Sequence, residues 1–235
     1  DYAAYTRPEV FVLETMGRDA GWLAASCCVS GNVDLLVLPE VDFGKQTFLD
    51  AVQKKFDEKG ECYIVVSEGA HYADGTYVSA GESAHDGFAH AVLGGAGAVI
   101  KQMIIDAGIV PRGIVQDLSR AARSSNFAQS LVDVTEAYEL GMSAHMRSAN
   151  PAFTAQVVGV KRAYTEEGAY NAQFFAGPAT QFANAVKHFP QEWILPNYQG
   201  ITDEARAYFI PLLKGEPKLI MDEVAPATLV PFNKR

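Results

Sequence analysis

The sequence predicts an α/β fold in which a parallel sheet is layered between helices. Short apolar runs alternate with helical patterns through the first 120 residues. The runs are apolar on both faces, which is typical of strands in a parallel sheet that helices cover on either side. Hydrophobic residues make up 49% of the 235-residue chain, enough to build such a core without disulfides.

The elements expected in the first part of the chain follow in order. The strands are residues 10–13, 34–38, 63–66 and 113–116. The helices between them are residues 21–29, a stretch with Phe48, Leu49, Val52 and Phe56 on one face, and a stretch with Phe88, Val92, Val99, Met103 and Ile104 at helical spacing. This alternation predicts one α/β domain over residues 1–120.

After Arg123 the pattern changes. We expect a helix over 132–146, a strand over 153–160 and a last helix over 202–213 that begins after Thr202 as N-cap. The aromatic, Gly- and Pro-containing stretch 164–200 can be assigned only in part. Residues 121–235 are therefore predicted to be helices and strands that return to complete the fold.

Charge and cysteine usage exclude several classes of function. The chain has 19 Lys and Arg against 28 Asp and Glu, a net charge of −9, which argues against a nucleic-acid or anionic-membrane surface. No apolar run approaches the roughly 18 residues of a membrane-spanning helix. Cys27, Cys28 and Cys62 contain no C-x-x-C pair and predict neither a disulfide framework nor a zinc site. A cytoplasmic protein with reduced thiols is expected.

Ligands of such sheets bind beyond the carboxyl ends of the strands, and Met16-Gly17-Arg18 stands at the end of the first one. Gly17 and Gly21 permit close backbone approach, so that free N–H groups would face a ligand and Arg18 would add a fixed cation. This pattern indicates an anion or phosphoryl site. The alternative is a tight turn with a surface arginine.

Two other strand ends carry candidate ligands. Glu68 ends the third strand, where a carboxylate would accept hydrogen bonds from sugar hydroxyls or, alternatively, would cap the loop. Arg112, Arg120 and Arg123 surround the fourth strand and would either bind a phosphate dianion or form a solvated basic rim. His85 and His90 do not have the spacing of a metal site.

Taken together, these segments resemble the phosphofructokinase family, and within it the pyrophosphate-dependent enzymes. The matching motifs are Met16-Gly17-Arg18-Asp19-Ala20-Gly21-Trp22, Val65-Val66-Ser67-Glu68-Gly69, Leu118-Ser119-Arg120-Ala121-Ala122-Arg123, Glu136-Ala137-Tyr138-Glu139-Leu140-Gly141 and the tail Ala207-Tyr208-Phe209-Ile210-Pro211-Leu212-Leu213-Lys214-Gly215-Glu216. The resemblance implies the family's Rossmann-like fold, with its sugar-phosphate half mainly over 1–120. It also implies phosphoryl transfer to the 1-hydroxyl of fructose 6-phosphate, a step of glycolysis.

The resemblance also implies roles for residues. Met16, Gly17 and Arg18 would contact the sugar, and Arg18 would offset charge on the transferring phosphoryl group. Glu68 would hold sugar hydroxyls and Arg120 the 6-phosphate. Arg7 and Arg112 lie near the positions of the family's cross-subunit arginines, which also imply a homo-oligomer.

Some family features are absent or altered. An aromatic residue or His and a Gln are usual where this chain has Asp117 and Ser119, and His is common where it has Asp19. The family's Gly-Gly-Asp-Gly donor loop and its Thr-Ile-Asp-Asn-Asp element with the general base occur nowhere in the sequence. We therefore expect no metal site in this chain. An N-terminal half or partner subunit would supply the base, the donor (pyrophosphate or ATP) and Mg²⁺.

Two functions remain open on the sequence alone. The first is the C-terminal portion of a pyrophosphate-dependent phosphofructokinase that supplies the sugar-phosphate side of the site. The second is a non-catalytic regulatory subunit that binds a sugar phosphate, a reading to which the altered positions Asp19, Asp117 and Ser119 give weight.

Overall fold

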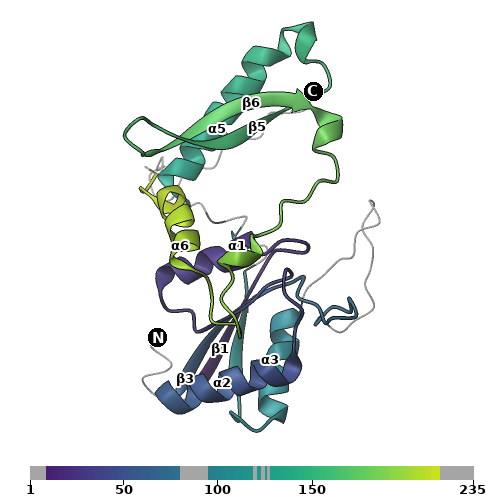
Figure 1. The fold of residues 1–235 in the computed structure, drawn as a ribbon, viewed down its shortest axis with the longest axis vertical. Coiled ribbons are helices and arrows are strands. Elements are labelled where there is room, and N and C mark those ends of the chain that lie inside the picture. The colour runs from purple at the N-terminus through teal and green to yellow at the C-terminus, as the bar shows by residue number, and fades with distance from the viewer. Residues whose placement is uncertain (1–8, 80–94, 119–120, 123–124, 126–127, 218–235) are drawn as a thin grey trace, which may run out of the picture. The chain divides into compact units, whose positions relative to one another are not determined.

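The computed structural model describes residues 9–79, 95–118, 121–122, 125 and 128–217 (Figure 1). The chain forms two compact units. Unit 1 comprises residues 1–123 and 186–209, and unit 2 comprises residues 124–185 and 210–235. The first crossing between the units therefore lies close to the boundary expected at 120, but residues 186–209 return to unit 1.

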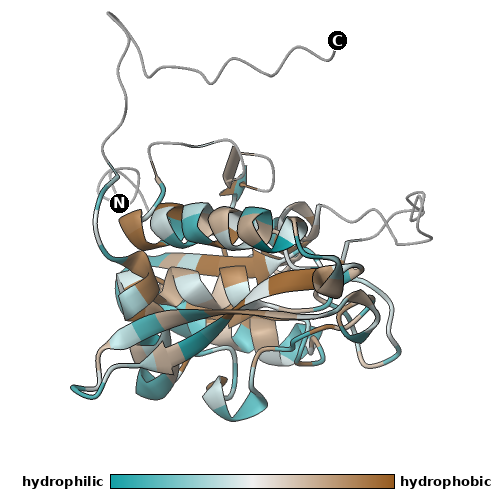
Figure 2. Cartoon of the chain, turned by 90° about the horizontal axis from the view of Figure 1, so that it is seen from above, coloured by the Kyte–Doolittle hydropathy of each residue, from teal (hydrophilic) through white to brown (hydrophobic). Residues whose placement is uncertain are grey.

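Unit 1 is built on a four-stranded parallel sheet. Its strands are β1 (Glu9–Thr15), β2 (Leu35–Val37), β3 (Glu61–Ser67) and β4 (Gly113–Asp117), in the order β2-β3-β1-β4. All neighbouring pairs are parallel, which confirms the predicted α/β class. Three successive residues of β3, Ile64, Val65 and Val66, are at most 3% exposed, as expected for strands covered on both faces; Figure 2 colours the described residues by hydropathy.

Helices cover both faces of the sheet. On one face, α2 (Lys45–Lys59) and α3 (Ala96–Asp106) pack against it, burying Phe48, Ile100 and Ile104 with Val10 and Val12 of β1. The helix that we expected to reach back to Phe88 begins, within the described residues, at Ala96; residues 80–94 lie outside them. Gly95 precedes it in the left-handed conformation at φ 89°.

The other face is covered by α1 (Trp22–Cys27), a following 3₁₀ turn (Cys28–Ser30) and the returning segment with α6 (Asp203–Phe209). The Trp22 ring meets Phe189 edge-on, with centroids 5.0 Å apart. Thr202 caps α6 as predicted, because its Oγ1 accepts a hydrogen bond from the Ala205 N–H at 3.3 Å. Short 3₁₀ turns occur at Gln191–Trp193, in this segment, and at Ile210–Leu213, in unit 2.

Unit 2 contains α5 (Leu131–Ser148) and a hairpin of β5 (Gln156–Tyr164) and β6 (Tyr170–Pro178), with 3₁₀ turns at Pro151–Phe153 and Ala179–Gln181. Ser130 begins α5 by accepting a hydrogen bond from the Asp133 N–H at 3.0 Å. The helix was predicted, whereas β6 falls in the stretch that the sequence assigned only in part. Within α5, all of which the structure describes, no residue is buried.

Candidate functional site

The register of the sheet brings two predicted motifs together. Glu14 and Thr15 of β1 lie beside Val66 and Ser67 of β3 in the parallel pairing. The chain segments that leave these strands, with Met16-Gly17-Arg18 on one and Glu68 on the other, are therefore neighbours at the carboxyl edge of the sheet. The Glu68 N–H donates to the Thr15 carbonyl at 3.0 Å, which joins the two segments directly.

Glycines allow these two turns to touch. Gly17 has φ 148°, and its carbonyl accepts hydrogen bonds from Ser67 Oγ at 2.6 Å and the Gly69 N–H at 3.1 Å. A Cβ on Gly69 would lie 1.8 Å from the Arg18 carbonyl oxygen. The Gly in each motif is thus required by backbone contact between the turns.

The expectation of free backbone N–H groups in this turn is wrong for both glycines. The Gly17 N–H donates to Glu68 Oε1 at 3.2 Å, and the Gly21 N–H donates to Glu40 Oε1 at 2.9 Å. Carboxylates of the same chain therefore take the positions that a bound anion would occupy. The Gly17 and Gly21 N–H groups are therefore not open to an anion, and the role of Arg18 in binding one stays a prediction.

Arg18 is paired with its neighbour. Its Nε donates to Asp19 Oδ2 at 2.8 Å, and the two side chains are 31% and 40% exposed. The acid that the sequence placed beside this arginine is thus not turned away from it. Because the contact uses Nε, it fixes the plane of the guanidinium while lowering the net positive charge at the turn.

Two carboxylates near strand ends, the buried Glu14 and the partly buried Glu40, received no role from the sequence. Glu14, 3% exposed, accepts hydrogen bonds from the N–H groups of Gly95 and Gly97. Glu40 accepts from the Phe189 N–H at 2.8 Å as well as from Gly21. For Glu14 the available signal was an acid at the end of an apolar strand, because a buried carboxylate needs hydrogen-bond donors.

Comparison with known proteins now identifies the family. Residues 2–147 match the family described as phosphofructokinase. The chain belongs to the phosphofructokinase family. The resemblance inferred from the sequence is thereby confirmed.

Two similar relatives in this family are pyrophosphate-dependent by name. Pyrophosphate–fructose 6-phosphate 1-phosphotransferases of Halomonas elongata and Methylococcus capsulatus are each 37% identical to the chain. The matches cover 90% and 91% of this chain but 50% and 51% of the relatives. The chain therefore spans about half the length of the curated relatives it matches.

Solved structures give the same result. The pyrophosphate-dependent phosphofructokinase of Nitrosospira multiformis is 26% identical, with a TM-score of 0.75 over 96% of this chain and 53% of that one. The enzyme of Marinobacter aquaeolei is also 26% identical, with a TM-score of 0.76 over 95% of this chain and 52% of that one. The fold around the turn is thus that of a phosphofructokinase.

Not all of the predicted phosphofructokinase site residues come together. Arg112 precedes β4 at the opposite, amino edge of the sheet, where its Nη2 donates to the buried Glu9 Oε1 at 2.8 Å. Within one chain it does not join Arg18 and Glu68, and its cross-subunit role stays a prediction. Arg7, Arg120, Arg123 and Ser119 lie outside the described residues. Asp117 ends β4 in register with Glu14.

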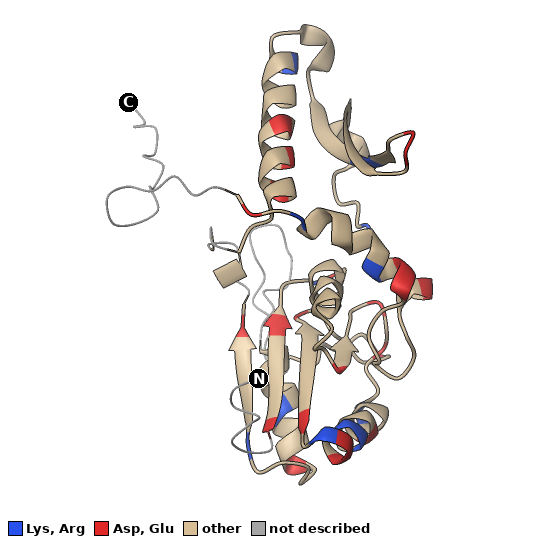
Figure 3. Cartoon of the chain, turned by 90° about the vertical axis from the view of Figure 1, so that its left-hand side faces the viewer, with Lys and Arg blue, Asp and Glu red and all other residues tan. Residues whose placement is uncertain are grey.

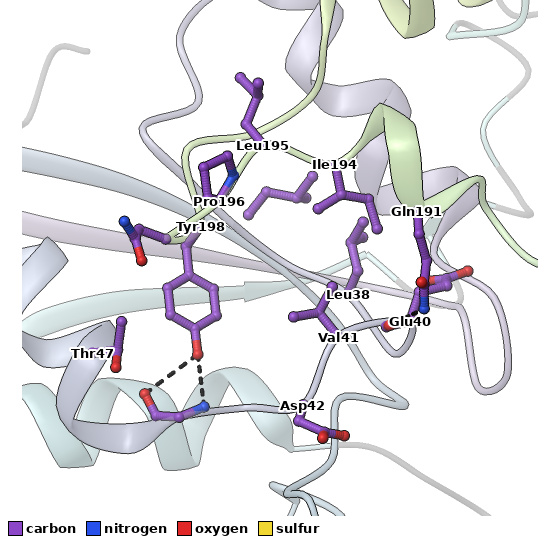
Figure 4. A pocket seen from close by; sticks show the side chains of 13 residues that line it. Leu38, Glu40, Val41, Asp42, Thr47, Gln191, Ile194, Leu195, Pro196 and Tyr198 are labelled. Atoms are coloured by element: carbon purple, nitrogen blue, oxygen red, sulfur yellow. Dashed lines mark hydrogen bonds between the residues drawn. The ribbon is translucent and has the colours of Figure 1, made fainter.

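A pocket of about 660 Å³ lies beside Glu40 in unit 1 (Figure 4). Leu38 and Ile194 contribute apolar walls, and Asp42 supplies a second carboxylate. Tyr198 reaches across it: its Oη accepts from the Gly44 N–H at 2.7 Å and lies 3.3 Å from the Gly44 carbonyl. Because the lining has carboxylates but neither Lys nor Arg, this pocket is poorly suited to a phosphate.

The described residues also bear on metal binding and on membranes. They contain no group of three or more His, Cys, Asp or Glu placed to hold a metal ion. None of the described helices combines the length and apolar character needed to cross a bilayer.

Proposed function

We propose that this chain forms the sugar-phosphate side of a pyrophosphate-dependent 6-phosphofructokinase, which transfers a phosphoryl group to the 1-hydroxyl of fructose 6-phosphate. The observation that carries the proposal is the meeting of Met16-Gly17-Arg18 with Glu68 at the carboxyl edge of the sheet. The names of the relatives support the donor and the sugar.

In this proposal the turn supplies one cation and one oriented carboxylate. Arg18 contacts the sugar and offsets negative charge on the transferring phosphoryl group, a stabilisation that is strongest where charge develops. Glu68 is anchored by the Gly17 N–H at 3.2 Å, which fixes the carboxylate for sugar hydroxyls. Met16 and Gly17 form the floor against which the sugar lies.

The remaining groups of the proposed site come from outside this turn. Arg120 binds the 6-phosphate, and Arg7 and Arg112 act across a subunit interface in a homo-oligomer. The general base lies in the N-terminal half or on a partner subunit. Mg²⁺ enters with pyrophosphate and is held mainly by that half. The reaction is a step of glycolysis and takes place in the cytoplasm, where Cys27, Cys28 and Cys62 stay free thiols.

The test is an assay of the intact native enzyme with fructose 6-phosphate, Mg²⁺ and either pyrophosphate or ATP. We expect turnover with pyrophosphate and a loss of at least about 100-fold in kcat/KM for Arg18→Ala, because a charge-stabilising donor is removed. Arg147→Ala, which removes an arginine from α5 in unit 2, is the matched control and should retain activity.

Two outcomes would change the proposal. Saturable sugar-phosphate binding without turnover on either donor would favour the regulatory subunit, which the relatives' names do not favour. Unchanged affinity for fructose 6-phosphate in Arg120→Ala would remove Arg120 from the 6-phosphate site.

A further inference from the structure

Glu14 is a buried carboxylate that the proposed chemistry does not use. It is 3% exposed and ends β1 two residues before Met16. Figure 3 shows acidic residues at the tips of strands in this sheet. A carboxylate at such depth is costly unless several donors surround it.

The donors come from the start of α3. The Gly95 N–H bonds to Glu14 Oε1 at 2.8 Å, and the Gly97 N–H bonds to Oε2 at 2.9 Å. The helix has no acidic residue in its first turn and no side-chain cap of its own. Glu14 therefore supplies from β1 the negative charge that the N-terminus of a helix attracts.

The fit around this carboxylate is close. A Cβ on Gly97 would come within 3.2 Å of Glu14 Oε2 and 3.1 Å of Val115 Cγ1. Glycine at 97 thus leaves room for the carboxylate between α3 and β4. Each carboxylate oxygen has its own N–H donor, as a bound phosphate or carboxylate ligand would at a helix N-terminus.

Glu14 is also tied to the segments that carry the site. Its carbonyl accepts a hydrogen bond from the Leu118 N–H at 3.0 Å, beyond the end of β4. The next carbonyl, that of Thr15, accepts from Glu68 at 3.0 Å. Any shift of Glu14 therefore moves the start of the Met16-Gly17-Arg18 turn relative to Glu68 and β4.

We propose that Glu14 is a positioning residue for phosphoryl transfer. Its carboxylate fills the N-terminus of α3 in place of a substrate phosphate and so fixes the turn that presents Arg18. The inference rests on the proposed function for its kinetic consequence. Because the Glu14 carboxylate already occupies the N-terminus of α3, the proposal assigns the binding of substrate phosphates to arginine side chains.

The first experiment compares Glu14→Gln with Ser130→Ala in the intact native enzyme. Glutamine keeps the size but removes the charge and sets an amide N–H₂ against one of the two N–H donors. We expect kcat/KM for fructose 6-phosphate to fall by about 10- to 100-fold, the scale of a misplaced catalytic group. Glu14→Asp, which keeps the charge, should retain more activity than Glu14→Gln.

Ser130→Ala is the matched control because it removes the side-chain cap of α5 in unit 2. It should lower the melting temperature while leaving kcat/KM within about threefold of the wild type. If Glu14 had only a structural role, Glu14→Gln would resemble this control: its melting temperature would be lower, but its kcat/KM, measured well below that temperature, would be unchanged. That result would overturn the inference.

A second measurement does not depend on catalysis. In Glu14→Ala the α3 N-terminus is vacated, so sodium formate should raise the melting temperature of this variant more than sodium chloride at equal ionic strength. The wild type should show no such difference. Equal effects of the two salts on Glu14→Ala would contradict the assignment of Glu14 to the α3 N-terminus. If formate stabilises Glu14→Ala as expected but the wild-type enzyme has no phosphofructokinase activity, only the proposed function is wrong.

Discussion

Arg18 and Asp19 are adjacent residues whose side chains meet at 2.8 Å, at the point where we propose that a sugar phosphate binds. The aspartate orients the arginine and also opposes the anion. Replacing Asp19 by Asn separates the orientation of Arg18 from the opposition to the anion, because Asn keeps an acceptor for the Arg18 Nε–H but carries no charge.

We predict that Asp19→Asn tightens binding of fructose 6-phosphate by about two- to fivefold, since removing one negative charge near a bound anion in a partly exposed site changes its binding by up to about 1 kcal/mol. The measurement is calorimetric titration of the intact enzyme at low and high salt. The gain should shrink as salt rises. Asp106→Asn, an acid at the far end of α3, should leave the affinity unchanged; weaker binding by Asp19→Asn would show that orientation outweighs charge.

The buried thiols give a pH dependence. Burial raises the pKa of Cys28 and of Cys62 to about 12, with a smaller contribution to Cys62 from the Asp34 carboxylate. The folded-state pKa lies above the unfolded value near 9, so stability is complete below pH 9 and is lost as pH rises toward 12.

We therefore predict that the free energy of unfolding in urea falls by about 1 kcal/mol per buried thiol between pH 9 and pH 10. Cys62→Ala should flatten this slope, although the lost side chain lowers stability at every pH. Equal slopes for the wild type and Cys62→Ala would contradict the assigned pKa of Cys62.

At the scale of elements, the two glycine turns at the carboxyl edge form a single backbone contact. A Cβ at position 69 would overlap the Arg18 carbonyl at 1.8 Å, whereas one on Gly60, at the end of α2, meets nothing within 4 Å.

We predict that Gly69→Ala costs more than about 2 kcal/mol of stability or displaces the Met16-Gly17-Arg18 turn, since the backbone must move. Gly60→Ala should cost only the roughly 1 kcal/mol of its left-handed conformation at φ 74°. Chemical denaturation gives the loss of unfolding free energy for each variant. An equal loss in Gly69→Ala and Gly60→Ala would argue against contact between the two turns.

The sequence predicted the elements that carry strong patterns. Apolar runs identified all four strands of the sheet, and their ends located Arg18 and Glu68 correctly at one edge. The hydrogen-bond partners of Glu14 and Glu40 could not be predicted, because they are backbone N–H groups distant in sequence. Every residue type except proline has such a donor, so the sequence does not show which one is used.

The hairpin shows the opposite difficulty. Strand β6 has Tyr170, Phe174 and Phe175, which favour strands, but also Asn, Gly and Pro and no β-branched residue, so its own sequence gives a mixed signal. It forms because it pairs along its whole length with β5, from Gln156 with Pro178 to Tyr164 with Tyr170. Pairing of this kind depends on the partner and is not visible within the strand's own sequence.

At the scale of the whole molecule, the two units differ in how much they bury. Strands β1 and β3 lie in a core whose residues are almost fully inaccessible, such as Val12 and Ile64 at 0%. In unit 2, by contrast, α5 buries no residue and leaves Tyr138 70% and Met146 74% exposed.

We predict that hydrogen exchange of this 235-residue chain is slowest in β1 and β3 and at least about tenfold faster in β5, β6 and α5, because protection follows burial and contact density. Mass spectrometry after proteolysis resolves the two units. Equal protection of both units would mean that unit 2 is stabilised by contacts beyond its own described residues.

The central claim is that Arg18 and Glu68 form the sugar-phosphate side of a phosphofructokinase site. The most direct test is calorimetric titration of the intact enzyme with fructose 6-phosphate and, separately, with fructose. We predict saturable binding of the phosphorylated sugar, weakened by about 10- to 100-fold in Arg18→Ala through loss of charge-assisted hydrogen bonds, and much weaker binding of fructose. Equal affinity of the wild type and Arg18→Ala for fructose 6-phosphate would contradict the claim.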